Sequence, residues 1–208
     1  MSATYEATEL TGPTLVLEPL RVSHYSALAS IAGDKRIWEN FTIDGSTAAG
    51  FCDWFEDVMR EVLLGKKFTY AVRCKTEGVY FGVTGFQELI RDHGRATIGP
   101  TWLAPHVWGR GINTELRLLV LSVLFDELHI KRVQGRTTVE NVRNIHAFER
   151  IGASCEGRLR HYWRDPSGRY RDYVIFSILS SEWPGVRTRL LERLARHNGA
   201  LEASISAS

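Results

Sequence analysis

The sequence predicts one domain of the α+β class, with a mixed and mostly antiparallel central sheet of about seven strands flanked by helices. Three observations predict it. Strand-like segments in the first half of the chain are joined by short turns, as in hairpins. A single strand–helix–strand crossover follows in the middle of the chain. The 208 residues, 44% hydrophobic and 24% charged, suffice for one sizeable core.

The first third of the chain supplies one strand and two helices. Residues 14–20 alternate between apolar and polar side chains as a strand does. Ser23 suits the N-cap of a helix that ends at Ala32. Residues 46–64 form the second predicted helix, because apolar side chains recur there at helical spacing.

The middle of the chain supplies three strands and a long apolar helix. The predicted strands are residues 67–74, 79–90 and 96–103, and the predicted helix is residues 116–128. Gly82 and Gly85 suggest a bulge or a close backbone approach in the second of these strands. Pro100 cannot donate to a strand ladder, which fits a third strand that splays or bulges.

The last third of the chain completes the domain. Its predicted elements are a strand at residues 132–138, a helix at 142–151, strands at 154–163 and 170–179 joined by a turn at 165–168, and a helix at 182–197 capped by Ser180 or Ser181. No repeat or linker divides these elements. We therefore expect an N-terminal extension over residues 1–13, a single domain over 14–197 and a flexible tail over 198–208, where the residues are small and polar.

The most informative segment joins the predicted strand 96–103 to the helix 116–128. It reads Trp108-Gly109-Arg110-Gly111-Ile112-Asn113-Thr114. A strand, a glycine turn and a helix N-terminus form an anion site, because the first N–H groups of a helix have no intrahelical acceptor. The segment lacks the Lys-Ser/Thr pair of a nucleotide-triphosphatase loop and the third glycine of a dinucleotide fingerprint. An ordinary turn with two glycines is the alternative interpretation.

A second motif follows the predicted strand 132–138. It begins with Asn141 and ends with Gly152-Ala153. In this order and spacing, the two motifs resemble those of the GNAT superfamily of acetyl-CoA-dependent N-acetyltransferases, whose acyl-CoA loop reads Arg/Gln-x-x-Gly-x-Gly/Ala. Trp108 at the first loop position, with Thr114-Glu115 after the loop, resembles the branch that acetylates ribosomal-protein N-termini. The resemblance covers residues 14–194.

The resemblance implies a sheet splayed between its fourth and fifth strands, with acetyl-CoA bound in the split as a co-substrate. The backbone N–H groups of residues 110–114 would bind the pyrophosphate. Trp102 and Leu103 would pair with the pantetheine arm through their backbone, where one N–H also stabilises the developing oxyanion. Asn141 would hydrogen-bond the arm, and its alternative role is a helix N-cap. The cofactor-binding residues predicted in this way are Trp102, Leu103, Trp108, Gly109, Arg110, Gly111, Ile112, Asn113, Thr114, Asn141, Asn144 and Phe148.

Two positions depart from the family pattern. Many relatives carry a Tyr seven residues after the motif Asn as the general acid, and the ribosomal branch can carry a Ser three residues after it. This chain has Phe148 and Asn144 there. Phe148 cannot donate a proton, whereas the Asn144 amide could hydrogen-bond the thiolate sulfur. Glu88, His161 and Asp172 are candidates for the base. The alternative interpretations are that Glu88 lies on a solvated strand face, that His161 is a surface residue and that Asp172 forms an ion pair. The catalytic candidates are therefore Glu88, Asn144 and His161.

The acceptor is expected to be a primary amine. Neutralising an α-amine of pKa about 8 at pH 7 costs about 1.4 kcal/mol, whereas a lysine amine costs about 4.6 kcal/mol. A site without an evident acid–base pair therefore suits a protein N-terminal α-amine or a similar amine. Trp38, Phe41 and Trp163 are the expected walls of the acceptor pocket. The alternatives are a small-molecule acetyltransferase, acting on a polyamine, amino acid or aminoglycoside, and a non-catalytic acyl-CoA-binding regulatory protein.

Charge and cysteine content limit the partners. The net charge is +2, so neither nucleic acid nor an anionic membrane is an expected partner. The three cysteines are odd in number and lack metal-ligand spacing, which predicts no metal and a reducing, cytoplasmic compartment. The sequence shows neither a signal-peptide pattern nor an apolar run of membrane-spanning length. The resemblance implies a homodimer. We also expect a bulky residue at Gly111 to weaken CoA binding with little loss of folding.

Overall fold

A single twisted sheet organises the molecule. The computed structural model describes residues 5–165 and 167–205, and within that part of the chain nine strands form one sheet. The strands are β1 (Leu10–Thr11), β2 (Leu15–Pro19), β3 (Lys67–Cys74), β4 (Tyr80–Ile90), β5 (Arg95–Ile98), β6 (Trp102–Leu103), β7 (Arg132–Thr138), β8 (Ser154–Arg164) and β9 (Tyr170–Leu179). Their order is β1-β2-β3-β4-β5-β7-β9-β8, and β6 pairs with β4.

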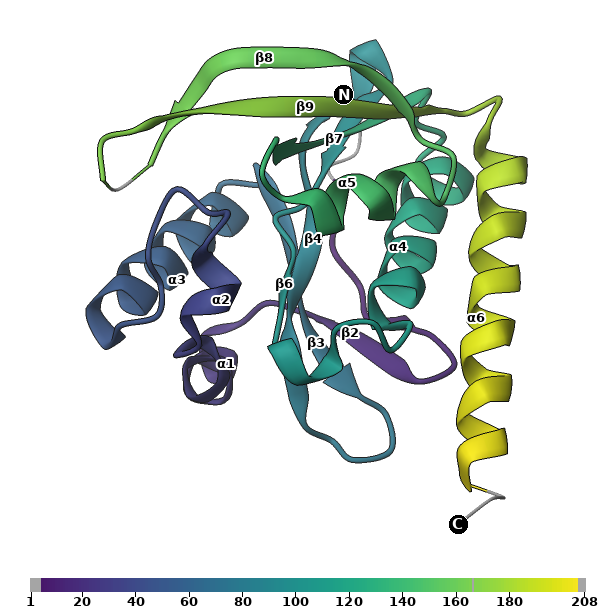
Figure 1. The fold of residues 1–208 in the computed structure, drawn as a ribbon, viewed down its shortest axis with the longest axis horizontal. Helices are drawn as coiled ribbons and strands as arrows, with labels where there is room; N and C mark the ends of the chain where they lie inside the picture. The colour runs from purple at the N-terminus through teal and green to yellow at the C-terminus, as the bar shows by residue number, and fades with distance from the viewer. Residues whose placement is uncertain (1–4, 166, 206–208) are drawn as a thin grey trace.

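Helices cover both faces of the sheet. They are α1 (Tyr25–Ala32), α2 (Lys35–Trp38), α3 (Ala48–Leu63), α4 (Ile112–Ser122), α5 (Val142–Glu149) and α6 (Trp183–Ile205). Helices α1–α3 lie on one side of the sheet and α4–α6 on the other (Figure 1). All strand pairs are antiparallel except β5–β7, which the α4 crossover makes parallel. The predicted α+β class is therefore confirmed.

The sheet opens in its middle. β5 pairs with β7 only over Arg95–Thr97 and Arg132–Gln134. The chain then leaves the ladder at residues 99–101, which include Pro100, and re-enters as β6, which pairs with β4. The predicted strand 96–103 is thus two strands, and its second half diverges from β7. The expected splay between the fourth and fifth predicted strands is confirmed.

A glycine on β4 permits the close approach of β6. A Cβ built on Gly82 would lie 2.1 Å from the carbonyl oxygen of Trp102. No larger residue fits there without moving backbone, so the bulge or close approach inferred from this glycine is present.

Two apolar clusters fill the space between the sheet and its helices. The cluster beneath α4–α6 contains Phe86, Leu121 and Phe176, and the cluster beneath α1–α3 contains Trp38, Trp54 and Trp102. The Trp102 ring centroid lies 5.6 Å from those of both Trp38 and Trp54. Each face of the sheet is therefore backed by its own core.

Helix α4 is joined to β2 by a buried carboxylate. Glu115 is 2% exposed. Its Oε1 accepts from the N–H groups of Thr14, at 2.9 Å, and Leu15, at 3.0 Å, while its Oε2 accepts from the Thr14 hydroxyl at 2.6 Å. The first turn of α4 is consequently anchored to the other end of the sheet.

Residues before the predicted domain also pack on it. Leu10–Thr11 forms β1, and the Tyr5 ring lies 5.2 Å from that of Phe68. The Tyr5 and Tyr70 hydroxyls are hydrogen-bonded at 3.0 Å. Residues 1–4 of the expected extension and 206–208 of the expected tail lie outside the described residues.

The start of α1 and the end of α6 differ from prediction. Helix α1 begins at Tyr25, after a 3-10 turn over Val22–His24, and Ser23 is not its cap. The turn forms because His24 Nδ1 accepts from the Arg21 N–H. Helix α6 continues to Ile205 rather than ending at His197.

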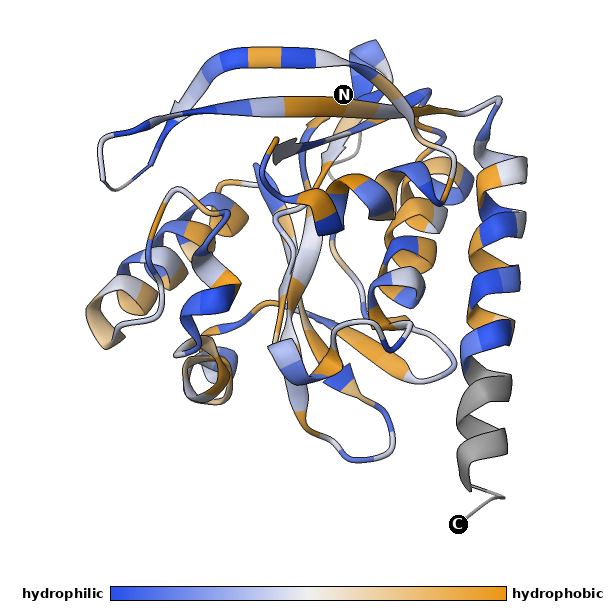
Figure 2. Ribbon diagram, in the orientation of Figure 1, coloured by the Kyte–Doolittle hydropathy of each residue, from blue (hydrophilic) through white to orange (hydrophobic). Residues whose placement is uncertain are grey.

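The β8–β9 hairpin reaches beyond the rest of the sheet. It crosses the top of Figure 1 and ends over the side of α2 and α3. Its far end is hydrophilic, whereas β9 becomes hydrophobic toward α6 (Figure 2). Within the predicted turn at 165–168, the Asp165 carboxylate accepts from the N–H groups of Ser167 and Arg169, and Pro166 lies outside the described residues.

Candidate functional site

The loop before α4 adopts the conformation that its glycines permit. Gly109 has φ +77° and Gly111 has φ +81°, both in the left-handed region. Gly111 is the N-cap of α4 and supplies no capping side chain. The segment is therefore a strand–turn–helix with an uncapped helix N-terminus, as the sequence predicts.

Part of this N-terminus is free to bind an anion. The Thr114 and Glu115 N–H groups donate to the Gly111 carbonyl, and the Arg110 N–H points back to the Val107 carbonyl at 3.4 Å. Ile112 and Asn113 are the first two helical residues, and within the described chain their N–H groups have no acceptor. Of the amides from 110 to 114, those of Ile112 and Asn113 are thus best placed for a phosphate.

Gly111 contributes to stability as well as to the conformation of the loop. A Cβ at this position would lie 2.9 Å from Cγ of His197 on α6, in addition to the strain of φ +81°. The expectation that a bulky residue at Gly111 leaves folding intact is therefore wrong. A Cβ built on Gly109 would meet no atom of the described chain within 4 Å, so Gly109 is the cleaner site for a substitution.

β6 presents one free backbone edge to the split. The Ala104 N–H donates to Phe81 on β4 at 2.7 Å. Because successive residues of a strand point to opposite edges, the N–H and C=O of Leu103 face away from β4. Leu103 is one of the two residues that the sequence assigned to pantetheine pairing and to the oxyanion. The backbone of the other, Trp102, instead faces Val83 of β4.

Trp108 lies across the mouth of the split. Its Nε1 donates to the Leu103 carbonyl at 2.8 Å, and the guanidinium of Arg143 lies 3.5 Å from its ring centroid. The indole packs against both apolar clusters. Since Arg143 belongs to α5, this stack brings the first turn of α5 opposite the free edge of β6.

Asn141 and Asn144 occupy the start of α5. The Asn141 side chain accepts from the Asn144 N–H at 3.2 Å, so its role as an N-cap is observed. The Asn144 Oδ1 accepts from Arg117 of α4 at 2.9 Å. This bond directs the Asn144 amide NH₂ away from Arg117.

Phe148 belongs to the core. It is 4% exposed, stacks on Phe176 at 4.9 Å and has the Arg117 guanidinium 4.0 Å above its ring. Gly135 of β7 makes room for it, because a Cβ there would lie 2.3 Å from the ring. The side chain therefore acts as packing beneath α5.

Glu88 of β4 is hydrogen-bonded to both β5 and β7. Its Oε2 accepts from the Thr97 hydroxyl at 2.6 Å, and its Oε1 accepts from Arg136 at 2.8 Å. Arg136 also donates to the Tyr162 hydroxyl at 2.7 Å. Burial raises the pKa of Glu88, but the bonds from Thr97 and Arg136 outweigh it and hold the pKa below its ordinary value. Glu88 is thus an ionised carboxylate, 42% exposed, beside the split.

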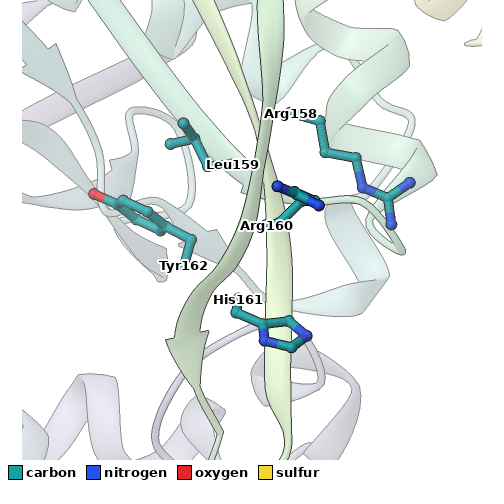
Figure 3. A pocket seen from close by; sticks show the side chains of 5 residues that line it. All are labelled: Arg158, Leu159, Arg160, His161 and Tyr162. Carbon is teal, nitrogen blue, oxygen red and sulfur yellow. The ribbon is translucent and has the colours of Figure 1, made fainter.

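His161 and Asp172 lie together on β8 and β9. The Asp172 carboxylate accepts from the His161 N–H and from Arg158, which lower its pKa. Figure 3 shows a shallow pocket along β8 in which His161 and Tyr162 point to opposite sides of the strand. The His161 ring stacks on Tyr170 at 5.2 Å. Tyr162, rather than His161, joins the Glu88–Arg136 group.

The three expected acceptor-pocket aromatics do not lie together. Trp38 is 4% exposed, belongs to α2, and donates through Nε1 to the Ala32 carbonyl. Phe41 lies beside it, with ring centroids 5.4 Å apart. Trp163 is 49% exposed on the hairpin. Trp38 is a core residue, whereas Phe41 and Trp163 retain accessible surface.

Comparison with known proteins decides the family. Residues 14–154 match the family model described as an acetyltransferase (GNAT) domain. The chain belongs to the GNAT acetyltransferase family. It is an acetyl-CoA-dependent N-acetyltransferase, as the two motifs indicated.

Individual relatives agree with this assignment. The chain is 25% identical over 175 residues to the uncharacterised N-acetyltransferase p20 of Bacillus licheniformis, covering 82% of this chain and 96% of p20. It is 31% identical over 109 residues to YdaF of Bacillus subtilis, which is provisionally named a ribosomal N-acetyltransferase. The match covers 52% of this chain and 58% of YdaF. The structure of a GCN5-related N-acetyltransferase from Brucella melitensis superposes with a TM-score of 0.83 at 25% identity. The superposition covers 91% of this chain and 86% of that structure. The resemblance to the ribosomal branch is thereby supported at the level of similarity.

Three residues of the candidate site escaped the sequence prediction: Arg117, Arg136 and Tyr162. Arg117 had a signal, because an arginine three and four residues before Val120 and Leu121 stands on the apolar stripe of a helix. Arg136 and Tyr162 had none, since strand pairing alone brings them to Glu88.

The described residues show neither a metal site nor a membrane span. No group of three or more His, Cys, Asp or Glu side chains there is arranged to bind a metal ion. None of the described helices combines the length and apolarity needed to cross a membrane.

Proposed function

We propose that this acetyltransferase transfers the acetyl group of acetyl-CoA directly to the N-terminal α-amine of a protein or peptide. The observation that carries the proposal is the state of Glu88. This carboxylate beside the split is ion-paired to Arg136 and has a lowered pKa, so it is a weak proton acceptor. An amine that is already partly neutral at physiological pH suits such a site.

The proposed cofactor site follows the split. The Ile112 and Asn113 N–H groups would hold the pyrophosphate, and the Leu103 edge of β6 would pair with the pantetheine arm. The uncapped N-terminus of α4 and the outward-facing Leu103 groups fit this ligand. Bound acetyl-CoA supplies an activated thioester, whose carbonyl would accept from the Leu103 N–H.

The acceptor would approach from the face that carries Glu88. Its exposed carboxylate can hold an ammonium group by a charge-assisted hydrogen bond. Arg136 and the Tyr162 hydroxyl fix the position of that carboxylate. The accessible surface of Phe41 and Trp163 remains our proposal for the walls of the pocket.

The protonation cost separates the classes of acceptor. Neutralising an α-amine at pH 7 costs about 1.4 kcal/mol, and a lysine or other alkyl amine costs about 4.6 kcal/mol. A difference of about 3 kcal/mol corresponds to roughly a hundredfold in rate if the site supplies no strong base. The ribosomal name of the relative YdaF supports the same class of acceptor.

The experiment is an acetylation assay on a matched set of amines. We would compare peptides with free Ala and Ser N-termini, the same peptides with blocked N-termini and an internal Lys, and spermidine. Mass spectrometry would locate the acetyl group. We expect acetylation of the free N-termini, with kcat/KM at least tenfold above that of the other amines.

Two results would contradict the proposal. Preferred acetylation of spermidine or of the internal Lys would assign the protein to a different acceptor class. Acetyl-CoA binding without turnover on any amine would support a non-catalytic regulatory protein. Both results leave membership of the family unchanged.

A further inference from the structure

Arg117 is a buried cation with no anionic partner in the described part of the chain. It is 9% exposed and faces α5 from the second turn of α4. Its guanidinium donates to the Ala147 carbonyl at 3.2 Å and to the Asn144 Oδ1 at 2.9 Å, and it lies over the Phe148 ring. Burying an arginine without a carboxylate is costly, so its retention calls for a role.

The guanidinium stays charged in this setting. Burial lowers the pKa of Arg117 to about 10, which leaves the side chain protonated at neutral pH. The groups that contact it are an amide, a backbone carbonyl and a phenyl ring, and all three belong to α5. Its positive charge is therefore uncompensated at close range.

Arg117 also decides which way Asn144 points. An amide side chain offers one acceptor and one donor group. Because Arg117 donates to the Oδ1 of Asn144, the NH₂ group is the end left for another partner. Asn144 follows Arg143, which reaches the free edge of β6 through its stack on Trp108. The NH₂ donors therefore belong to the first turn of α5, the same turn that Arg143 brings to Trp108.

We propose that Arg117 is a positioning residue for acetyl transfer: it holds the Asn144 NH₂ group toward the split and adds positive charge beside it, so that the sulfur of CoA leaves as a stabilised thiolate. The inference rests on the proposed cofactor site. It adds to that site a group that stabilises the leaving thiolate, because Phe148 and Asn144 occupy the positions where relatives carry a proton-donating side chain.

The step balances without a protein acid. The amine nitrogen bonds to the carbonyl carbon, and the carbon–sulfur bond breaks with its electron pair on sulfur. The proton lost by the amine passes to water. The thiolate takes up a proton from solvent after it leaves the site, so that the net products are an amide and a thiol.

The experiment titrates the thiol of bound CoA, without any acceptor. Ultraviolet absorbance of the thiolate would be followed against pH, as the difference between complexes with CoA and with desulfo-CoA, so that the protein's own cysteines cancel. In the unaltered protein we expect the pKa of the bound thiol to lie at least about one unit below that of free CoA titrated in the same buffer. In Arg117→Met, the pKa of the bound thiol should return most of the way to that of free CoA.

Asn144→Leu provides a second, milder test. It removes the NH₂ donor with little change in volume and leaves Arg117 in place. If Arg117 acts through Asn144, the pKa of the bound thiol should rise in this variant too. In the double variant, the rise in that pKa should be smaller than the sum of the rises in the two single variants. This variant also keeps the inference testable if Arg117→Met does not fold.

Arg189→Met is the matched control. Arg189 donates to the Ile151 carbonyl at the end of α5, as Arg117 donates to Ala147. Its loss should lower stability without shifting the bound thiol pKa. An unshifted pKa in both Arg117→Met and Asn144→Leu, or an ordinary pKa in the unaltered complex, would overturn the inference. A lowered thiol pKa combined with no α-amine acetylation would uphold it and reject the proposed acceptor.

Discussion

The indole N–H of Trp108 is hydrogen-bonded to the Leu103 carbonyl, 2.8 Å away, at the free edge of β6. An edge strand normally offers its N–H and C=O groups to an incoming chain. Here the protein satisfies one of these groups with its own side chain. Any extended ligand that pairs with β6 therefore meets Trp108 first.

Replacing Trp108 by Phe should destabilise the free protein more than the acetyl-CoA complex. Trp108→Phe keeps an aromatic ring beneath Arg143 and leaves the Leu103 carbonyl without its donor, a loss of about 1 kcal/mol. Bound cofactor can supply a replacement donor. Chemical unfolding with and without saturating acetyl-CoA measures both differences.

Trp183→Phe is the control for this prediction. Trp183 also donates through Nε1, to Asp126 at 2.7 Å, at the base of α6. The loss of unfolding free energy in Trp183→Phe should be the same with and without acetyl-CoA. If Trp108→Phe behaved identically to it, Trp108 and the cofactor would not share the Leu103 carbonyl.

The two loop glycines should differ in their tolerance of alanine. Gly109→Ala introduces only the strain of a left-handed backbone, about 1 kcal/mol. Gly111→Ala adds a contact with His197 and should be less stable. Thermal unfolding compares the two variants. His197→Ala in the Gly111→Ala background should recover part of the difference, and no recovery would show that the strain is in the loop alone.

Glu88→Gln should raise KM for the amine about tenfold with a smaller effect on kcat. The reason is that an ionised, ion-paired carboxylate binds an ammonium group better than it accepts a proton, and a charged hydrogen bond contributes about 1.5 kcal/mol or more. Steady-state kinetics at several pH values measures the split. A loss confined to kcat, with a changed pH profile, would instead identify Glu88 as the general base.

Glu156 should contribute to stability only above acidic pH. Arg132 and the Ser177 hydroxyl lower its pKa from 4.5 to about 2. A carboxylate whose folded pKa is lowered stabilises the protein above its ordinary pKa, and this stabilisation is lost as the pH falls from about 4.5 to about 2. Because the side chain is 36% exposed, we expect about 1 kcal/mol after solvent screening.

Glu156→Gln tests that pH window. The variant should be less stable than the unaltered protein in urea unfolding at pH 7 and pH 5, and the difference should vanish near pH 2. A difference that stayed constant to low pH would mean that the hydrogen bonds, rather than the charge, carry the effect.

The conformation of the loop proposed to bind phosphate could be predicted because it is local in sequence. Gly109, Gly111 and Asn141 act through backbone angles and caps that neighbouring residues determine. The family motifs lie in the same short segments. Spacing along the chain therefore located the loop, the split and the start of α5.

The proposed acceptor side depends on the register between distant strands. The ladder between β8 and β9 shifts between Cys155 and Gly157 and again between Leu159 and Trp163. These irregularities place Tyr162 beside Arg136, and they turn His161 to the other side of the strand. Strand alternation cannot anticipate such shifts. His161 was selected for its residue type alone, because histidine is a common acid–base group.

The Glu115 carboxylate would give the start of β2 a part in the proposed cofactor site. Its hydrogen bonds to Thr14 and Leu15 couple the first turn of α4 to a segment about a hundred residues earlier in the chain. If acetyl-CoA binding slows amide hydrogen exchange in α4, exchange should therefore also slow at Thr14 and Leu15. A fusion partner or truncation that disturbs the start of β2 would act as a remote inhibitor, weakening the cofactor site without touching it.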